Sequence, residues 1–193
     1  MIPPRHDAGQ AFPIYIMVVA GLLFLALAYL TVGQAAVNRS GAQTAADAAA
    51  LAAAQKTRDQ LTDLWVAVVR DPAKWQAIFD GDGAGNFCWR ADELAAQNDA
   101  QVPHCVPETL AYTVEVRTNK KVGDSVVPGV ADVRSTARAR AVIEPLCTFE
   151  LPPGKKDAAL PRLTCQGKVW DLKPDDPSRL PKPDDLFDVH LAD

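Results

Sequence analysis

The chain has 193 residues, of which 48% are hydrophobic, 7% aromatic and 23% charged, and its formal net charge is −4. The hydrophobic fraction argues against a disordered chain. The acidic balance argues against a protein that binds nucleic acid through a general basic surface. These averages conceal very different segments, because residues 8–38 carry no charged side chain whereas residues 173–193 are mostly proline and charged residues.

The uncharged segment predicts a membrane-spanning helix. Residues 12–32 read FPIYIMVVAGLLFLALAYLTV, and about 21 residues at ~1.5 Å each cross the roughly 30 Å hydrocarbon core of a bilayer. Tyr15 and Tyr29 lie near its two ends, where amphipathic rings favour the membrane interface. The alternative is a secretory signal cleaved near Gly33-Gln34-Ala35, but the apolar core of a signal is about 7–15 residues long. We therefore expect a retained, single-pass anchor.

All the cysteines, at Cys88, Cys105, Cys147 and Cys165, follow this segment. An even number of cysteines is typical of an oxidising compartment, which predicts a cytoplasmic N-terminus and an extracytoplasmic C-terminal part at the cell membrane. The local pairs Cys88–Cys105 and Cys147–Cys165 are the simplest of the possible connectivities, and the sequence does not choose among them. Because the chain has no CxxC and no histidine spacing typical of zinc, we expect no metal and no cofactor.

The helix is expected to continue beyond the membrane. Alanine is the best helix former, and no proline occurs between Pro13 and Pro72. These features predict one long helix, or two nearly collinear ones, over about residues 13–70. The alanine-rich part presents small side chains that either let another helix approach closely or simply form a stiff stalk. The predicted packing face consists of Ala45, Ala46, Ala48, Ala49, Ala52 and Ala53.

The remaining chain predicts a small antiparallel sheet. Apolar and polar residues alternate over residues 110–116 and 132–143, as in half-buried strands, and the second segment has small residues on its inner face, able to lie under a helix. Further strands are expected near residues 146–151 and 163–172. The predicted fold class is α+β, with a long N-terminal helix followed by a small sheet head in a pilin-like architecture.

The expected organisation has five parts. They are a cytoplasmic N-terminus (1–11), a transmembrane helix (12–33), an alanine-rich stalk helix (34–71), an extracytoplasmic head (72–172) and a flexible acidic, proline-rich tail (173–193), in which residues 186–191 are a candidate docking strand or turn.

A resemblance to a known family is carried by Gly9-Gln10, by Asn38-Arg39 and above all by AQTAADAAALAAA over residues 42–54. Residues 8–55 resemble the N-terminal module of TadE/TadG-like proteins of the tight-adherence (Flp) pilus system. The resemblance implies a non-enzymatic subunit, minor pseudopilin-like or anchoring, of a pilus assembly or secretion apparatus. Its implied partners are membrane lipid, the pilin, platform proteins, other pseudopilins and the assembly ATPase complex, with homo- or hetero-oligomers formed through the N-terminal helix and no nucleic acid. The alternative is an adhesin-like or ligand-binding module held outside the membrane on a stalk.

In members of this family with true pilin signals, a prepilin peptidase cuts after a glycine. The candidate bond here joins Gly9 and Gln10, and Tyr15 falls where the signal places its tyrosine, but Ile14 replaces the glutamate expected at the fifth mature position. An unpaired intramembrane carboxylate is costly and is kept where it neutralises a neighbouring subunit. Its absence argues against a repeating filament subunit, and cleavage itself stays open.

Two other patterns suggest binding chemistry. Residues 80–86 resemble the start of a calcium loop, but Ala84 and Ala91 stand where ligands are required, so we interpret the segment as a glycine-rich turn. Arg134, Arg138 and Arg140 share one strand face, which indicates either a site for anionic glycans, lipid or polyphosphate, or a solvated face partly paired with Asp132 and Glu144. The four tryptophans are expected to serve as core and interface anchors, and no catalytic site is predicted.

Overall fold

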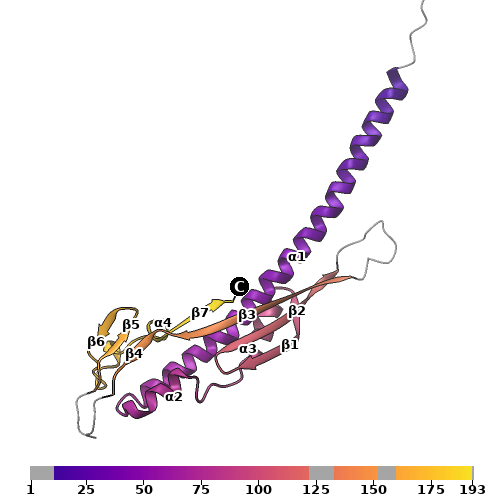
Figure 1. Ribbon diagram of the computed structural model, residues 1–193. Helices are drawn as coiled ribbons and strands as arrows, with labels where there is room; N and C mark the ends of the chain where they lie inside the picture. The colour runs from indigo at the N-terminus through magenta and orange to yellow at the C-terminus, as the bar shows by residue number, and fades with distance from the viewer. Residues whose placement is uncertain (1–10, 122–132, 152–159, 193) are drawn as a thin grey trace, which may run out of the picture.

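The computed structural model describes residues 11–121, 133–151 and 160–192 (Figure 1). Its longest element is α1 (Ala11–Ala67), a helix of 57 residues and therefore about 86 Å long at ~1.5 Å per residue. Pro13 stands in its first turn, where a missing N–H costs nothing. Gly33 and Gly41 lie within the helix. Of the two arrangements expected over about residues 13–70, one long helix or two nearly collinear ones, the structure has one continuous helix.

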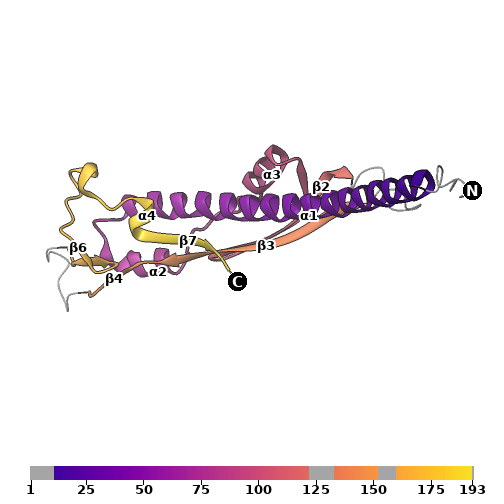
Figure 2. The ribbon, with the colours of Figure 1, turned by 90° about the horizontal axis from the view of Figure 1, so that it is seen from above.

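A four-stranded antiparallel sheet packs along the C-terminal half of α1 (Figures 1 and 2). Its order is β1-β2-β3-β7, formed by β1 (Ala100–Glu108), β2 (Ala111–Lys121), β3 (Arg134–Pro145) and β7 (Phe187–Leu191). Helix α3 (Cys88–Gln97) packs against both α1 and β1. The α+β architecture expected from the sequence, an apolar N-terminal helix followed by an antiparallel sheet, is confirmed.

The register of the central strands explains which face of the sheet meets α1. Tyr112, Val114 and Val116 of β2 are buried, and they lie beside Ala141, Ala139 and Ala137 of β3. The alternate residues form the opposite, outer face, where Thr113 pairs with Arg140 and Glu115 with Arg138. Since alanines line both α1 and the inner face of β3, the helix can lie close to the sheet.

The end of the head farthest from the N-terminus has a larger-residue core. Helix α1 is followed there by η1 (Pro72–Lys74) and α2 (Trp75–Phe79), and a second sheet is formed by β4 (Cys147–Phe149), β5 (Leu163–Cys165) and β6 (Lys168–Trp170). Trp75 contacts Trp65 at 5.4 Å and Phe149 at 5.2 Å between ring centroids. Such pairs stabilise by about 0.5–1.5 kcal/mol beyond their buried area.

The segment predicted as one strand over residues 163–172 is instead a hairpin. Gln166 and Gly167 have φ of 48° and 80°, and they separate β5 from β6. Positive φ at both central residues is the geometry of the tight turns that suit the twist of a hairpin.

The C-terminal segment corrects the prediction of a flexible tail over residues 173–193. It passes through η2 (Pro177–Arg179) and α4 (Pro183–Leu186), and Leu180, Leu186 and Phe187 are buried. Strand β7 then pairs with β3 from Pro145↔Phe187 to Ala141↔Leu191. The few apolar residues among the prolines and aspartates are enough to dock this segment.

The alanine-rich part of α1 also differs from a free stalk. Ala42, Ala45, Ala46, Ala49 and Ala50 are completely buried, although they belong to the segment predicted as a stalk helix over residues 34–71. The sheet and α3 cover them. Only about residues 30–41 separate the head from the apolar segment, so a short neck replaces the expected long stalk.

Candidate functional site: the projecting N-terminal helix

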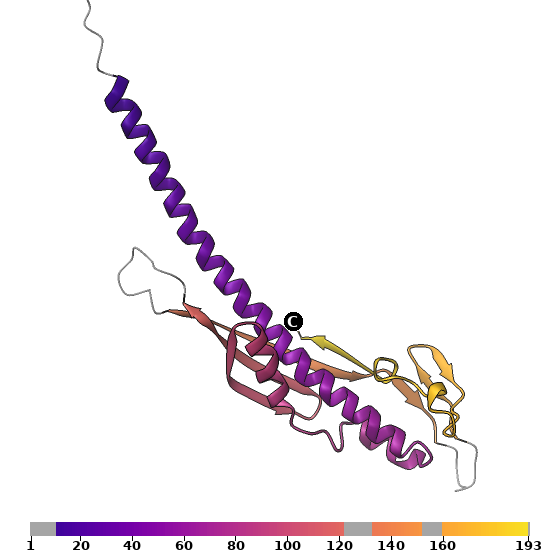
Figure 3. The ribbon, with the colours of Figure 1, turned by 180° about the vertical axis from the view of Figure 1, so that it is seen from behind.

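The N-terminal part of α1 projects beyond the described head (Figures 1 and 3). The segment Phe12–Tyr29 has a mean hydropathy of 2.3, and none of it is buried. In the described part of the chain it is the one helix long and apolar enough to cross a membrane. Its large side chains are open to the surroundings on every side: Phe12, Ile14, Tyr15, Ile16, Met17, Val18, Leu22, Leu23, Phe24, Leu25, Leu27 and Tyr29 are exposed.

This exposure is costly in water and favourable in lipid. Burying a large apolar side chain is worth about 1.5–3 kcal/mol, and a helix that is apolar all round must be buried in protein or lipid. The described head buries none of these residues, so the segment is open to lipid or to the helices of other proteins. The projecting helix is therefore the candidate functional site.

The candidate peptidase bond between Gly9 and Gln10 lies outside the described residues. Ile14 and Tyr15, which define the altered pilin-like signal, lie in the first turns of α1 and are 65% and 68% exposed. A neighbouring helix or lipid can therefore reach both side chains.

The predicted packing face is divided by the fold. Ala45, Ala46, Ala49 and Ala53 are completely buried against the chain's own sheet and α3, so no other helix can use them. Ala48 and Ala52 line a groove of about 530 Å³ between α1 and α3. Trp89, at 55% exposure, borders this groove together with Arg90 and Leu94. Small residues suit a close neighbour of any kind, and here the neighbours are the chain's own sheet and α3.

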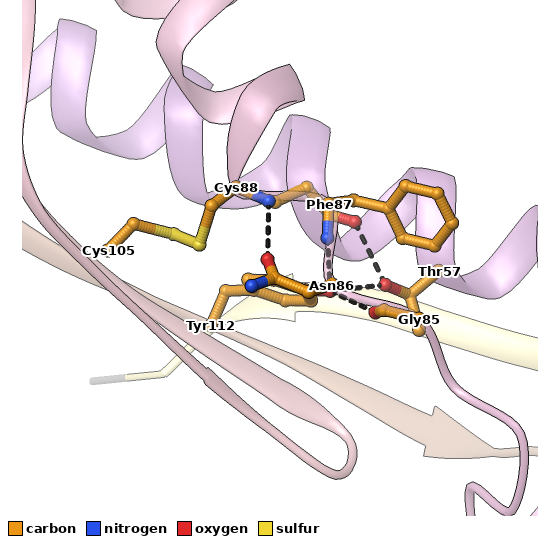
Figure 4. Close-up of a disulfide and its surroundings, with 8 residues drawn as sticks. Thr57, Gly85, Asn86, Phe87, Cys88, Cys105 and Tyr112 are labelled. Carbon is orange, nitrogen blue, oxygen red and sulfur yellow. Dashed lines mark hydrogen bonds between the residues drawn. A yellow bond between two sulfur atoms is a disulfide. The ribbon is translucent and has the colours of Figure 1, made fainter.

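A disulfide and one tyrosine hold the glycine-rich loop against α1 (Figure 4). Tyr112 Oη donates to the Gly85 carbonyl at 2.8 Å and accepts from the Phe87 N–H at 3.1 Å. It also lies 2.8 Å from the Thr57 hydroxyl of α1. The Thr57 hydroxyl also lies 3.2 Å from the Ala53 carbonyl oxygen of α1, so the three hydroxyl and carbonyl groups form one buried network. The pair Cys88–Cys105 then links the start of α3 to β1.

The glycine-rich loop thus has a structural role that the sequence only suggested. Gly81 and Gly83 have φ of 88° and 84°, and a Cβ at Gly81 would lie 2.7 Å from Thr109 Cγ2. Gln60 Oε1 accepts from the Gly85 N–H at 2.7 Å. Among the residues that the structure describes, no group of three or more His, Cys, Asp or Glu side chains is placed to hold a metal ion.

The second disulfide, Cys147–Cys165, joins directly opposed residues of β4 and β5. Both local pairs considered in the sequence are therefore formed, and the described residues include no free cysteine. The two bridges lie in different parts of the head, one between α3 and β1 and the other within the second sheet.

The arginine face lies on the outer surface of the sheet. Arg140 forms a two-pronged ion pair with Glu108 of β1, in which Nη2 donates to Oε2 at 2.7 Å. This hydrogen bonding to Arg140 holds the pKa of the Glu108 carboxyl below its ordinary value. Glu108 was not anticipated as a partner, because it belongs to β1, a strand that the sequence did not predict. Asp132, one of the expected partners, lies outside the described residues.

The fold and the projecting helix together define a class of protein, a disulfide-linked α+β head carried on an apolar helix. Residues 9–56 match the family described as "Putative Flp pilus-assembly TadE/G-like". The match confirms the resemblance of the N-terminal module and associates it with pilus assembly. No curated protein and no solved structure matches the chain.

Proposed function

We propose that this chain is a non-enzymatic, single-pass membrane subunit of a Tad/Flp-type pilus assembly or secretion apparatus, either pseudopilin-like or anchoring. The observation that carries the proposal is the unburied apolar segment Phe12–Tyr29 within a TadE/G-like module. The head is displayed outside the cytoplasm, where its two disulfides are stable. The 12–33 segment acts as the transmembrane part and residues 1–11 remain cytoplasmic.

The contact with other subunits is made through the projecting helix. Because the alanines at 45, 46, 49 and 53 are already covered by the head, partner helices of the pilin, the platform proteins or other pseudopilins meet α1 N-terminal to Ala42. Within lipid, such helices associate by close packing rather than by the hydrophobic effect. Oligomers of this chain, with itself or with relatives, form through the same segment.

Photo-crosslinking in native membranes tests this contact. A crosslinking amino acid is placed at Leu23 or Leu27, which are 61% and 64% exposed, and the matched control is placed at Thr136 on the outer face of the sheet. We expect pilin or platform proteins to be captured from the two helix positions and not from Thr136. No capture from either helix position, together with normal pilus output in a strain without the protein, contradicts the proposal.

Two mass measurements test the topology and the processing. Unreduced protein from the envelope is expected to contain no alkylatable thiol, whereas free thiols indicate that the head is cytoplasmic. The mature N-terminus distinguishes the two forms of the proposal. An N-terminus at Gln10 identifies a processed, pseudopilin-like subunit, and an N-terminus at or before Gly9 identifies an anchoring subunit.

The groove between α1 and α3 favours a second candidate function, an extracytoplasmic binding module. Its lining combines the exposed ring of Trp89 with the charged groups of Lys56, Asp59 and Arg90, a mixture typical of sites for polar ligands with an apolar face. The Trp89→Ala variant separates the two functions. Loss of adhesion with normal pilus assembly favours the binding module, and normal adhesion excludes this groove.

A further inference from the structure

Trp89 differs from the tryptophans of the head core. It is 55% exposed, whereas Trp65 and Trp75 are completely buried. It lies in the first turn of α3, and the ring of Phe87 meets its ring edge-on, with 6.4 Å between the centroids and 65° between the planes. A single exposed aromatic side chain is common on a protein surface. This one, however, borders the groove between α1 and α3, so its ring is open to a ligand in that groove.

The start of α3 holds this ring in a fixed place. The Cys88–Cys105 disulfide links the helix to β1 (Figure 4). Asn86 Oδ1 accepts a hydrogen bond from the Cys88 N–H at 2.9 Å, and the Phe87 N–H donates to Tyr112 Oη at 3.1 Å. An aromatic ring that is held in position before a ligand arrives lowers the entropic cost of binding.

The groove beside this ring offers both donors and acceptors of hydrogen bonds. Its polar lining consists of Gln55, Lys56, Asp59 and Arg90. Asp59 forms an ion pair with the adjacent Arg58 at 3.2 Å. Arg90 forms an ion pair with Glu93. A carboxylate and a guanidinium keep further acceptor and donor capacity in such pairs. Because both signs of charge and an amide occur together, the lining suits a neutral ligand rich in hydroxyl groups better than an ion.

The size and composition of the groove also favour a small organic ligand over a helix. Its volume of about 530 Å³ lies within the range of roughly 300–1,000 Å³ that is typical of ligand sites. A helix that docks in a groove lays an apolar face on an apolar lining. Here four of the nine lining residues are polar or charged, and they share the groove with the exposed indole.

We propose that this groove binds a neutral saccharide chain, with one pyranose ring stacked on Trp89. The proposal rests on the second candidate function, a binding module, and names its class of ligand. A pyranose with equatorial hydroxyls has only C–H bonds on its faces, and the negative face of an aromatic ring attracts such weakly positive groups. Its hydroxyls lie at the rim of the sugar ring, where Gln55, Lys56 and Asp59 can donate or accept hydrogen bonds. These requirements select β-linked chains of the glucose type.

Titration with tetrasaccharides tests the groove. The full chain is reconstituted in phosphatidylcholine nanodiscs, which avoid sugar-based detergents, and is titrated calorimetrically with cellotetraose, chitotetraose and the anionic tetragalacturonate. We expect both neutral tetramers to bind and Trp89→Ala to weaken their binding about tenfold or more. Asp59→Ala removes hydrogen bonds to a charged group and should weaken binding about tenfold. Asp63→Ala, at an exposed position of α1 outside the groove, is the matched control and should bind as wild type.

A second measurement needs no disruptive variant. In saturation-transfer NMR, the sugar protons that lie against the protein receive the most saturation. We expect the axial protons on one face of one sugar ring to give the strongest signals. The conservative variant Trp89→Phe should keep this pattern at lower affinity, since it retains an aromatic face.

Each result bears on a separate claim. No binding of either neutral tetramer by the wild type, or tighter binding of tetragalacturonate, overturns the proposed ligand class. Unchanged affinity in Trp89→Ala, or saturation spread evenly over all ring protons, overturns the stacking. Equal affinities of Asp59→Ala and Asp63→Ala overturn the role of the polar lining.

These results are distinguishable from a failure of the proposed functions. If the tetramers do not bind while Trp89→Ala still abolishes adhesion, the saccharide is overturned, and the groove serves a protein partner in the second candidate function. The capture of pilus components from Leu23 and Leu27 does not involve the groove, so it tests the membrane subunit independently.

Discussion

The two halves of α1 have the same secondary structure and opposite environments. From Phe12 to Tyr29 the helix has large apolar side chains, and none of the segment is buried by the described head. From Ala42 to Ala67 it continues in line, but small residues come first and larger ones follow, and one side of it is buried in the head. The comparison teaches that hydrophobicity alone does not decide which half belongs to a core. The size of the facing side chains decides which half is covered. The small side chains of the alanine-rich half fit against the alanines of β3, whereas the apolar half carries large side chains.

The largest expected difference between the halves comes from one substitution made in each. Leu61→Ala removes a completely buried side chain and should lower the free energy of unfolding of the head by about 2–5 kcal/mol. Leu25→Ala, at a side chain that is 64% exposed, should leave it unchanged. Chemical unfolding of the detergent-solubilised chain, followed by tryptophan fluorescence, measures both. Equal destabilisation by the two variants would refute the division of the helix.

Enlarging an alanine sharpens the comparison further. Ala49→Leu places three more carbons in the close contact between α1 and the sheet, and overpacking of this kind costs about 1–3 kcal/mol. Ala36→Leu makes the same change at an exposed position of the neck and should not affect unfolding. The same unfolding assay reports both, and an undisturbed Ala49→Leu head would mean that the interface is looser than the structure indicates.

A polar contact ties the buried half to the loop before α3. Tyr112→Phe leaves the Thr57 hydroxyl, the Phe87 N–H and the Gly85 carbonyl without their shared partner, and unsatisfied buried groups cost about 1–3 kcal/mol. Hydrogen exchange should show the Phe87 amide losing protection in this variant. Tyr15→Phe, whose hydroxyl lies on the projecting half, is the control. Unchanged protection at Phe87 would show that water replaces the phenol without loss.

The smallest expected effect comes from the outer face of the sheet, which touches neither half of α1. The pKa of Glu108 is held below its ordinary value by Arg140. A lowered pKa in the folded state stabilises above the unfolded pKa, and this contribution disappears as the pH falls through the folded pKa. NMR titration of Glu108 should show the low pKa, and Arg140→Gln should raise it toward the ordinary value of a glutamate. An unaltered titration in Arg140→Gln would mean that the ion pair does not persist in solution.

Much of the architecture could be predicted because it depends on periodicity. The long helix follows from alanine content and the absence of proline, and β2 and β3 follow from strict alternation of apolar and polar residues. Strand β1 was missed because Pro103 and Pro107 interrupt its pattern, which an edge strand tolerates. The docking strand considered for residues 186–191 is present as β7 (Phe187–Leu191). The order of the rest of the tail was missed because its few apolar residues, such as Leu180, do not outweigh the prolines and aspartates around them.

The sequence predicted where the candidate site lies but not which element packs against its alanine face. The sequence located the apolar segment and the alanine face, yet small residues are equally suited to a neighbouring helix and to a strand. Only the fold shows that Ala45, Ala46, Ala49 and Ala53 are occupied by the chain itself.

The continuity of α1 through the neck has a geometric consequence. A helix advances about 1.5 Å and turns about 100° with each residue, and α1 has no break between the apolar segment and the head. One residue inserted within 30–41 would swing the whole head about a quarter-turn around the helix, so that its faces meet different neighbours. Four inserted residues would nearly restore the original direction while lifting the head about 6 Å. The length of the neck therefore sets both the azimuth and the elevation of every surface on the head.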